Sequence, residues 1–281
     1  MFRSRLLAGS ALALGAAGLI VADEFLAPYF PCLFVLALAA VVLATRELIH
    51  LFSASSRPSF ELVAVAVAVV LAANWISPVF GLNDPWRPVI YAFTAAVLGF
   101  LLFEMARYRV PGLAVMRVCT GLFAVAYLGL LPCFLVQLRW SEHPPAWLAL
   151  TLVIFVPKCG DIGAYFTGRF LGRTPFAPLL SPKKTWEGFF GGLFASVATA
   201  IGLSFAGPAF EIGIVEAVGF GLVVGLAGVL GDLSESLLKR DAGTKDAAKS
   251  IPGFGGVLDV IDSLLFAGPV AYLWWNRGAV Y

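Results

Sequence analysis

The chain has 281 residues, of which 60% are hydrophobic and 13% are charged, and its mean hydropathy is +0.91. Soluble domains are nearer half apolar and a quarter charged, and one core of this size could not bury so much apolar surface. The excess must face lipid, which excludes a cytosolic enzyme, a secreted disulfide scaffold and a disordered chain. The net charge of +2 is too small to indicate nucleic acid as a partner.

Nine segments are apolar enough to be membrane spans, since a helix needs about 20 mostly apolar residues to cross the hydrocarbon core. The predicted spans are Leu6–Ala22, Pro31–Ala44, Leu62–Phe80, Val89–Met105, Thr120–Leu138, Ala146–Leu171, Gly188–Phe205, Ile212–Leu230 and Val257–Trp275. The second span is short, and an extension backwards through Phe25–Phe30 would lengthen it. The sequence therefore predicts an all-α fold, a polytopic integral membrane helical bundle of about nine transmembrane helices.

Basic residues alternate between the segments that join these spans. Lysine and arginine collect in cytoplasmic loops. If the amino terminus is inside, the inside segments hold 16 of the 19 basic residues, and the outside segments keep only Arg87, Arg139 and Arg277. The pattern predicts a cytoplasmic amino terminus and a carboxyl terminus on the outside.

Polar residues are distributed unevenly along the chain. Before Val156 the charges lie mostly at the ends of spans, whereas from Lys158 to Asp262 they fall within or against apolar helices. We find no linker and no repeat between these two parts. The sequence predicts a single membrane domain over residues 1–281, in which residues 1–156 are mainly scaffold and residues 157–281 form the catalytic half.

The sixth predicted span carries charges in its interior. Lys158, Asp161, Tyr165 and Arg169 fall within a sector of roughly 80° on one helix face. Ionisable residues inside a span are typical of functional sites. The alternative is a lysine–aspartate pair that only locks the bundle together.

A second motif precedes the seventh span. Ser181 followed by Pro182 predicts a helix start, with the serine as N-cap and the proline at the first helical position. Lys183 and Lys184 would then lie in the first turn, where the helix dipole disfavours cations. Such an arrangement would suit a bound phosphate, and contact with anionic lipid headgroups at the cytoplasmic surface would explain it equally well.

A third motif follows the eighth span. Asp232, Glu235, Ser236 and Lys239 have the i, i+3, i+4, i+7 spacing of one helix face about 100° wide. A plain amphipathic helix would show the same spacing. However, Asp232 directly continues an apolar span, where a carboxylate is costly unless it has a role.

Glycines and two further carboxylates follow. Gly253, Gly255 and Gly256 would let backbone amides approach an anion closely, and they would equally allow a tight turn. Asp259 and Asp262 lie three residues apart at the start of the last span, where the helix dipole favours carboxylates. Hard oxygen ligands with basic residues nearby also suit Mg²⁺ held between protein and substrate phosphates.

Together these motifs resemble the signature of a known family. The matching residues are Asp161-Ile162-Gly163-Ala164-Tyr165, Ser181-Pro182 with Lys184-Thr185-Trp186, Ser236-Leu237-Leu238-Lys239-Arg240, Lys245-Asp246, Pro252-Gly253, Gly255-Gly256, Asp259 and Asp262. From Asp161 to Ser263 the chain is similar to phosphatidate cytidylyltransferase, also called CDP-diacylglycerol synthase. It departs from that pattern at two positions, because the family has His in place of Phe254 and Arg in place of Val260.

The resemblance implies that the phosphate of phosphatidic acid attacks the α-phosphorus of CTP, giving CDP-diacylglycerol and pyrophosphate. It implies Mg²⁺ as the cofactor, with Asp232, Asp259 and Asp262 as the metal ligands. The implied catalytic residues are Asp161, Lys239, Arg240 and Asp246. The residues implied to bind substrate and nucleotide phosphates are Ser181, Lys184, Ser236, Lys245, Gly253, Gly255 and Gly256.

The resemblance also implies a location and partners. We expect an integral protein of a bacterial inner membrane with its active site facing the cytoplasm, where CTP is available. The partners would be CTP, phosphatidic acid and membrane lipid, with a homodimer left open as the assembly.

Three other functions compete with this interpretation. A polyprenol or phytol kinase would use CTP and metal in the same way but phosphorylate an alcohol. A catalytically weakened relative would explain Phe254 and Val260. A transporter is disfavoured, because transporters often contain paired repeats and the polar residues here lie in one half.

Overall fold

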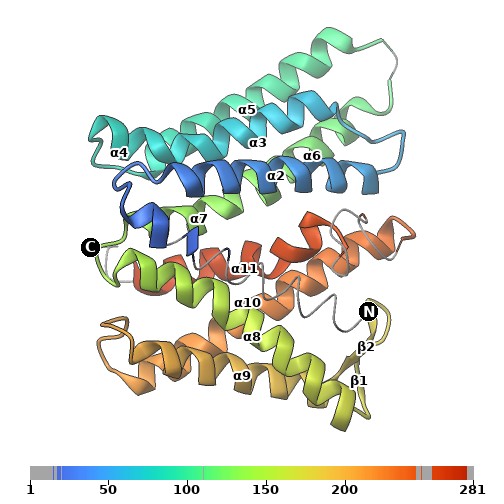
Figure 1. The fold of residues 1–281 in the computed structure, drawn as a ribbon. Coiled ribbons are helices and arrows are strands. Elements are labelled where there is room, and N and C mark those ends of the chain that lie inside the picture. Colours follow the sequence, from blue (N-terminus) through green and yellow to red (C-terminus); the bar gives the residue numbers. More distant parts are fainter. Residues whose placement is uncertain are drawn as a thin grey trace. The chain divides into compact units, whose positions relative to one another are not determined.

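The computed structural model describes residues 15, 18–19, 21–109, 111–244, 248 and 255–276, and most of them lie in helices (Figure 1). Eight stretches of helix within these residues are long and apolar enough to cross a membrane. They are Pro31–Leu51, Phe60–Phe80, Trp86–Arg107, Ala114–Trp140, Ala146–Leu171, Trp186–Ser204, Ile214–Asp241 and Val257–Trp275. They confirm the all-α polytopic membrane fold, while the predicted span Leu6–Ala22 lies mostly outside the described residues.

Contacts divide the described residues into two compact units. Unit 1 contains those within residues 1–136 and 242–260, and unit 2 contains those within residues 137–241 and 261–281. The last helix, α11 (Val257–Trp275), begins in unit 1 and continues unbroken into unit 2.

Two of the membrane spans of unit 1 are interrupted by turns that are not α-helical. A 3-10 turn at Ala73–Trp75 interrupts the span Phe60–Phe80, and a π-turn at Ala126–Leu130 interrupts the span Ala114–Trp140. Besides the first residues of α11, unit 1 contains α2 (Pro31–Leu51), α3 (Phe60–Ala72), α4 (Ile76–Phe80), α5 (Trp86–Arg107), α6 (Ala114–Val125) and all but the last residue of α7 (Leu131–Gln137).

The second span begins at Pro31 as predicted, but it ends later than predicted and does not extend backwards through Phe25–Phe30. Residues 25–29 form turns, and α2 instead continues seven residues beyond the predicted Ala44. Asp23 fixes the start, because its carboxylate accepts the amides of Cys32 at 3.0 Å and Leu33 at 2.9 Å. At the other end, Glu47 is buried and accepts two backbone amides. Because its charge has these partners, α2 can continue past it to Leu51.

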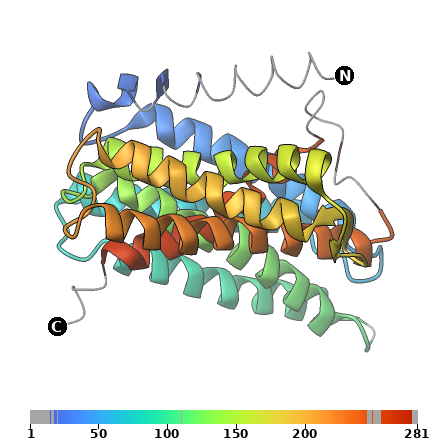
Figure 2. The ribbon, with the colours of Figure 1, turned by 90° about the horizontal axis from the view of Figure 1, so that it is seen from below.

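Unit 2 contains α8 (Ala146–Leu171), α9 (Trp186–Ser204), α10 (Ile214–Asp241) and most of α11. The bounds of α8 and α11 are those predicted from the apolar runs. Small residues let α8 and α9 pack closely: a Cβ on Gly192 would lie 3.0 Å from the Gly160 carbonyl oxygen and 3.0 Å from the Ala164 Cβ. Figures 1 and 2 show α9 running alongside α8, with a small β-hairpin beyond the end at which α8 stops.

This hairpin overturns the predicted helix start at Ser181. Ser181–Thr185 is strand β2, antiparallel to β1 (Pro175–Ala177), and α9 begins only at Trp186. The actual N-cap is Thr185, whose hydroxyl oxygen accepts the amide of Gly188 at 3.1 Å. Lys183 and Lys184 are therefore neighbours in an extended strand and point to opposite sides of it.

Candidate active site

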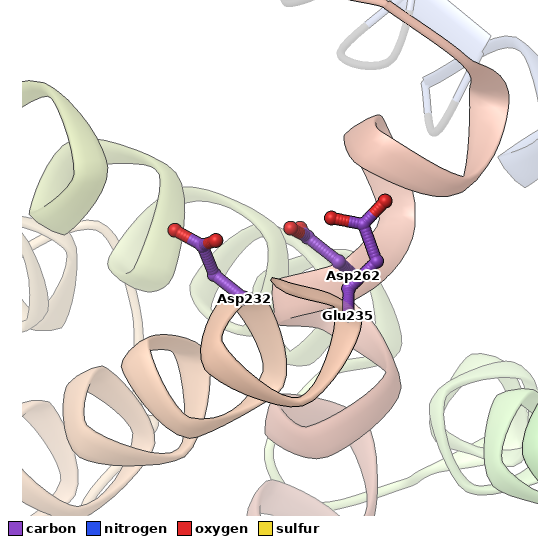
Figure 3. A group of neighbouring side chains, drawn as sticks. All are labelled: Asp232, Glu235 and Asp262. Carbon is purple, nitrogen blue, oxygen red and sulfur yellow. The ribbon is translucent and has the colours of Figure 1, made fainter. Parts of the chain in front are cut away.

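Three carboxylates come together where α10 and α11 pack in unit 2. Asp232 and Glu235 lie one turn apart on α10, and Asp262 comes from α11 (Figure 3). Each offers one oxygen, and these oxygens all lie within 4.8 Å of one another. Glu235 is 1% exposed and Asp262 is 6% exposed, whereas Asp232 is partly open. We call these three residues the carboxylate group.

Glycine makes this meeting of two helices possible. Gly231 lies directly before Asp232, and a Cβ there would lie only 3.0 Å from the Ser263 Cα and 3.1 Å from the Asp262 backbone carbon. A Cβ on Gly228, one turn earlier, would lie 2.7 Å from the Cβ of Pro157 on α8. Because the missing side chains let the backbones approach, carboxylates from two helices can share one small volume.

Each member of the carboxylate group lies near a lysine. Lys184 Nζ on β2 lies 2.7 Å from Asp232 Oδ2, and Lys239 Nζ on α10 lies 2.6 Å from Glu235 Oε2. Lys158 Nζ on α8 lies 3.7 Å from Asp262 Oδ1.

Lys158 also lies 3.5 Å from Asp161 Oδ2, so it joins that carboxylate to the site. The four residues of the predicted helix face therefore form two separate pairs. Lys158 pairs with Asp161, and Arg169 donates a hydrogen bond to the Tyr165 hydroxyl at 2.8 Å. This second pair lies on exposed side chains.

The donor set of the carboxylate group fits Mg²⁺. Magnesium prefers hard oxygen ligands and is usually held by one or two carboxylates together with substrate phosphates. Asp232, Glu235 and Asp262 supply only oxygen donors, and the surrounding ammonium groups can bind phosphate oxygens. The arrangement can therefore hold a divalent cation and a polyphosphate side by side.

Further residues predicted for the site lie around the same end of α10. Ser236 is buried, and its hydroxyl donates to Asp232 Oδ1 at 3.5 Å. Arg240 donates through Nε to the Leu180 carbonyl at 3.1 Å, which ties the turn of the hairpin to α10. Ser181 is a half-buried residue at the start of β2.

The start of α11, in unit 1, holds another set of predicted residues. Asp259 Oδ2 accepts the amide of Gly256 at 2.6 Å, so its carboxylate caps its own helix. Gly255 lies beside it with a φ of 104°, a conformation that favours glycine. Lys245, Asp246 and Gly253 lie outside the described residues, and their roles stay predictions.

Sequence reasoning did not assign Glu235 and Lys158 to the site. A signal for Glu235 was present, because it lies one turn after Asp232 on the same face, but the family signature draws attention to Asp259 instead. Lys158 had the same kind of signal through its pairing with Asp161. Neither spacing could show that both side chains meet Asp232 or Asp262, since that depends on how three helices pack.

The chain matches the model of the cytidylyltransferase family over residues 3–276. It is 30% identical to phosphatidate cytidylyltransferase 5, chloroplastic, of Arabidopsis thaliana, over 96% of this chain and 71% of that protein. It is 34% identical to phosphatidate cytidylyltransferase of Synechocystis sp., over 84% of this chain and 86% of that protein. It is 33% identical to phosphatidate cytidylyltransferase of Staphylococcus aureus, over 66% of this chain and 70% of that protein. With its membrane-spanning fold and its charged site between apolar helices, this chain belongs to the cytidylyltransferase family.

Proposed function

We propose that this protein is a phosphatidate cytidylyltransferase, which makes CDP-diacylglycerol and pyrophosphate from CTP and phosphatidic acid. A phosphate oxygen of phosphatidic acid forms a bond to the α-phosphorus of CTP, and the bond from that phosphorus to the bridging oxygen of pyrophosphate breaks. The observation that carries the proposal is the carboxylate group with its three lysines, built into an apolar bundle. The names of the relatives support the same reaction.

The chain's own residues would act mainly by placing charge. Phosphoryl and nucleotidyl transfer need little covalent help, and positioning with charge neutralisation supplies most of the acceleration. Lys184 on strand β2 and Lys158 on helix α8 approach the carboxylates from different elements, so they can bind different phosphates. A Mg²⁺ ion held by Asp232, Glu235 and Asp262 would neutralise phosphate charge in the transition state.

The lipid substrate fits the surroundings of the site. Trp186, Phe190 and Phe194 form an exposed aromatic face along α9, which would lie against acyl chains in a bilayer. The headgroup phosphate could then reach lysines at the polar end of the same helices. We further propose that this end faces the cytoplasm of a bacterial inner membrane, in agreement with the distribution of basic residues.

The product of the reaction tests the proposal. Purified protein is given CTP labelled at the α-phosphate, phosphatidic acid and Mg²⁺, with EDTA as one control and Asp262→Asn as another. We expect the parent protein with Mg²⁺ to form labelled lipid and unlabelled pyrophosphate. Neither product should form with EDTA or with Asp262→Asn. Folded protein that labels no lipid, or that converts CTP to CDP in the presence of a polyprenol, would overturn it in favour of a weakened relative or a lipid kinase.

A further inference from the structure

A buried carboxylate of unit 1 holds the first turn of α11. Glu47, on α2, is 6% exposed, and its two oxygens accept two backbone amides from a distant part of the chain. Oε1 accepts the amide of Val257 at 3.0 Å, and Oε2 accepts the amide of Leu258 at 2.8 Å, across sequence separations of 210 and 211 residues. Both hydrogen bonds join a backbone N–H to a carboxylate and are at least partly buried. Such charge-assisted hydrogen bonds are stronger than those between two neutral groups.

Two carboxylates together bind the free amides at this helix start. The first turn of any helix has donors without partners inside the helix. Here Asp259 accepts the amide of Gly256, and Glu47 accepts the next two. The negative charge of both side chains also lies at the positive end of the helix dipole. The turn that begins α11 is therefore fixed from its own helix and from α2.

The glycines before α11 fit these two carboxylates. A Cβ on Gly256 would lie 2.7 Å from the Glu47 carboxyl carbon, and a Cβ on Gly255 would lie 2.6 Å from Asp259 Oδ2. Any larger residue at either position would displace a carboxylate from the amides that it binds. The backbone before α11 therefore lies in close contact with both the Glu47 and the Asp259 carboxylates.

We propose that Glu47 is a positioning residue for the candidate active site. It does not touch substrate. It binds the first turn of α11, the helix whose first six residues include Asp262, a member of the carboxylate group. The inference rests on the proposed function, since it assigns Glu47 a part in placing the carboxylates that would bind Mg²⁺.

The variant that tests this is Glu47→Gln, which keeps the size of the side chain. A glutamine can accept one of the two amides, but its own NH₂ group would face the other. The matched control is Asp23→Asn: Asp23 is 1% exposed and likewise accepts two backbone amides, but at the start of α2, the opposite end of that helix from Glu47. Both variants are made in the full chain and measured below their unfolding temperatures.

We expect Glu47→Gln to raise the half-saturating Mg²⁺ concentration for CDP-diacylglycerol formation by about 10- to 100-fold, the usual effect of losing a group that orients metal ligands. Asp23→Asn should leave the half-saturating Mg²⁺ concentration within about threefold of the parent value. It should lower the unfolding temperature about as much as Glu47→Gln does. Glu47→Asp, which keeps the charge, should recover part of the loss. Equal Mg²⁺ dependence in Glu47→Gln and Asp23→Asn would overturn the proposal.

Hydrogen exchange provides a readout that needs no turnover. The amides of residues 257–262 should exchange faster in Glu47→Gln than in the parent, and no faster in Asp23→Asn. If the parent makes no labelled lipid, the proposed function fails while this comparison still decides the role of Glu47. Unchanged exchange over residues 257–262 in Glu47→Gln would refute the role even in an active enzyme.

Discussion

The carboxylate group concentrates like charges that the protein must balance. Two charged carboxylates within 4.8 Å of each other repel by at least about 3–4 kcal/mol at an effective dielectric constant of about 20. The lysines beside Asp232, Glu235 and Asp262 offset that repulsion within the folded protein. Such a balance is costly to build between apolar helices unless the site binds something charged, so we regard it as functional.

Glu235 is the member of the group that the family signature did not indicate. We expect Glu235→Gln to lower Mg²⁺-dependent turnover by at least about 10- to 100-fold, because it removes a charge from the proposed Mg²⁺ site and breaks the 2.6 Å ion pair with Lys239. The control is Glu216→Gln, a buried glutamate of the same helix that instead accepts the Trp274 indole N–H at 3.3 Å. That control should cost about 1–3 kcal/mol of unfolding free energy and leave turnover nearly unchanged. Equal turnover in the two variants would remove Glu235 from the site.

Lys184 competes with any cation for Asp232, because its ammonium group lies 2.7 Å from that carboxylate. In steady-state kinetics, Lys184→Met should raise the KM for CTP by about tenfold or more and lower the half-saturating Mg²⁺ concentration. Lys183→Met is the matched control, since Lys183 is the adjacent, exposed lysine on the other side of the strand. If both variants change KM alike, lysine at 184 acts only through the general surface charge.

At the scale of elements, the crossing of α10 and α11 depends on Gly231. A methyl group there would meet the backbone of Asp262 and Ser263, and backbone cannot turn away as a flexible side chain can. The two helices would have to separate, which would pull Asp262 away from Asp232 and Glu235. The geometry of the carboxylate group is therefore set by helix packing more than by the side chains that form it.

We expect Gly231→Ala to lower the unfolding free energy by about 1–3 kcal/mol and to reduce turnover more than that loss alone explains. Thermal unfolding in detergent and the labelled-CTP assay measure the two effects. Gly202→Ala, on α9, is the control, because a Cβ there would have nothing within 4 Å. It should leave turnover unchanged and stabilise the helix by up to about 1 kcal/mol. A fully active and stable Gly231→Ala would show that the crossing tolerates a side chain.

At the scale of the whole molecule, the site can be useful only if it opens to the compartment that contains its nucleotide. The β1–β2 hairpin and the polar end of α10 lie on segments that the distribution of basic residues predicts to be cytoplasmic. The segment before α8 should then lie on the opposite side, because α8 crosses the membrane once.

Cysteine labelling tests this orientation. In a variant with Cys32, Cys119, Cys133 and Cys159 replaced, single cysteines are introduced as Lys183→Cys in the hairpin and Glu142→Cys before α8, both at exposed positions. An impermeant maleimide should label position 183 only in inverted vesicles and position 142 only in right-side-out vesicles. The reverse pattern would mean an outward-facing site, and labelling of both from one side would mean that α8 does not span the membrane.

Much of the fold follows from local patterns. The apolar run from Ala146 to Leu171 is long enough for one span, and the structure begins and ends α8 at those residues. The helix start at Ser181 shows the limit of such patterns, since Ser181-Pro182 and Thr185 are both plausible N-caps in isolation. The structure uses Thr185, because pairing with β1 extends the preceding residues.

By itself, the sequence determined the class of this protein, a polytopic membrane protein, and the segment that carries its charged residues. Those properties depend on composition and on spacing within single helices, which the chain encodes locally. Only the tertiary structure decided that Glu235 joins Asp232 and Asp262, because the crossing at Gly231 sets their distance. Likewise, only the fold brings Glu47 to the amides of Val257 and Leu258, because no local pattern relates residues about 210 positions apart.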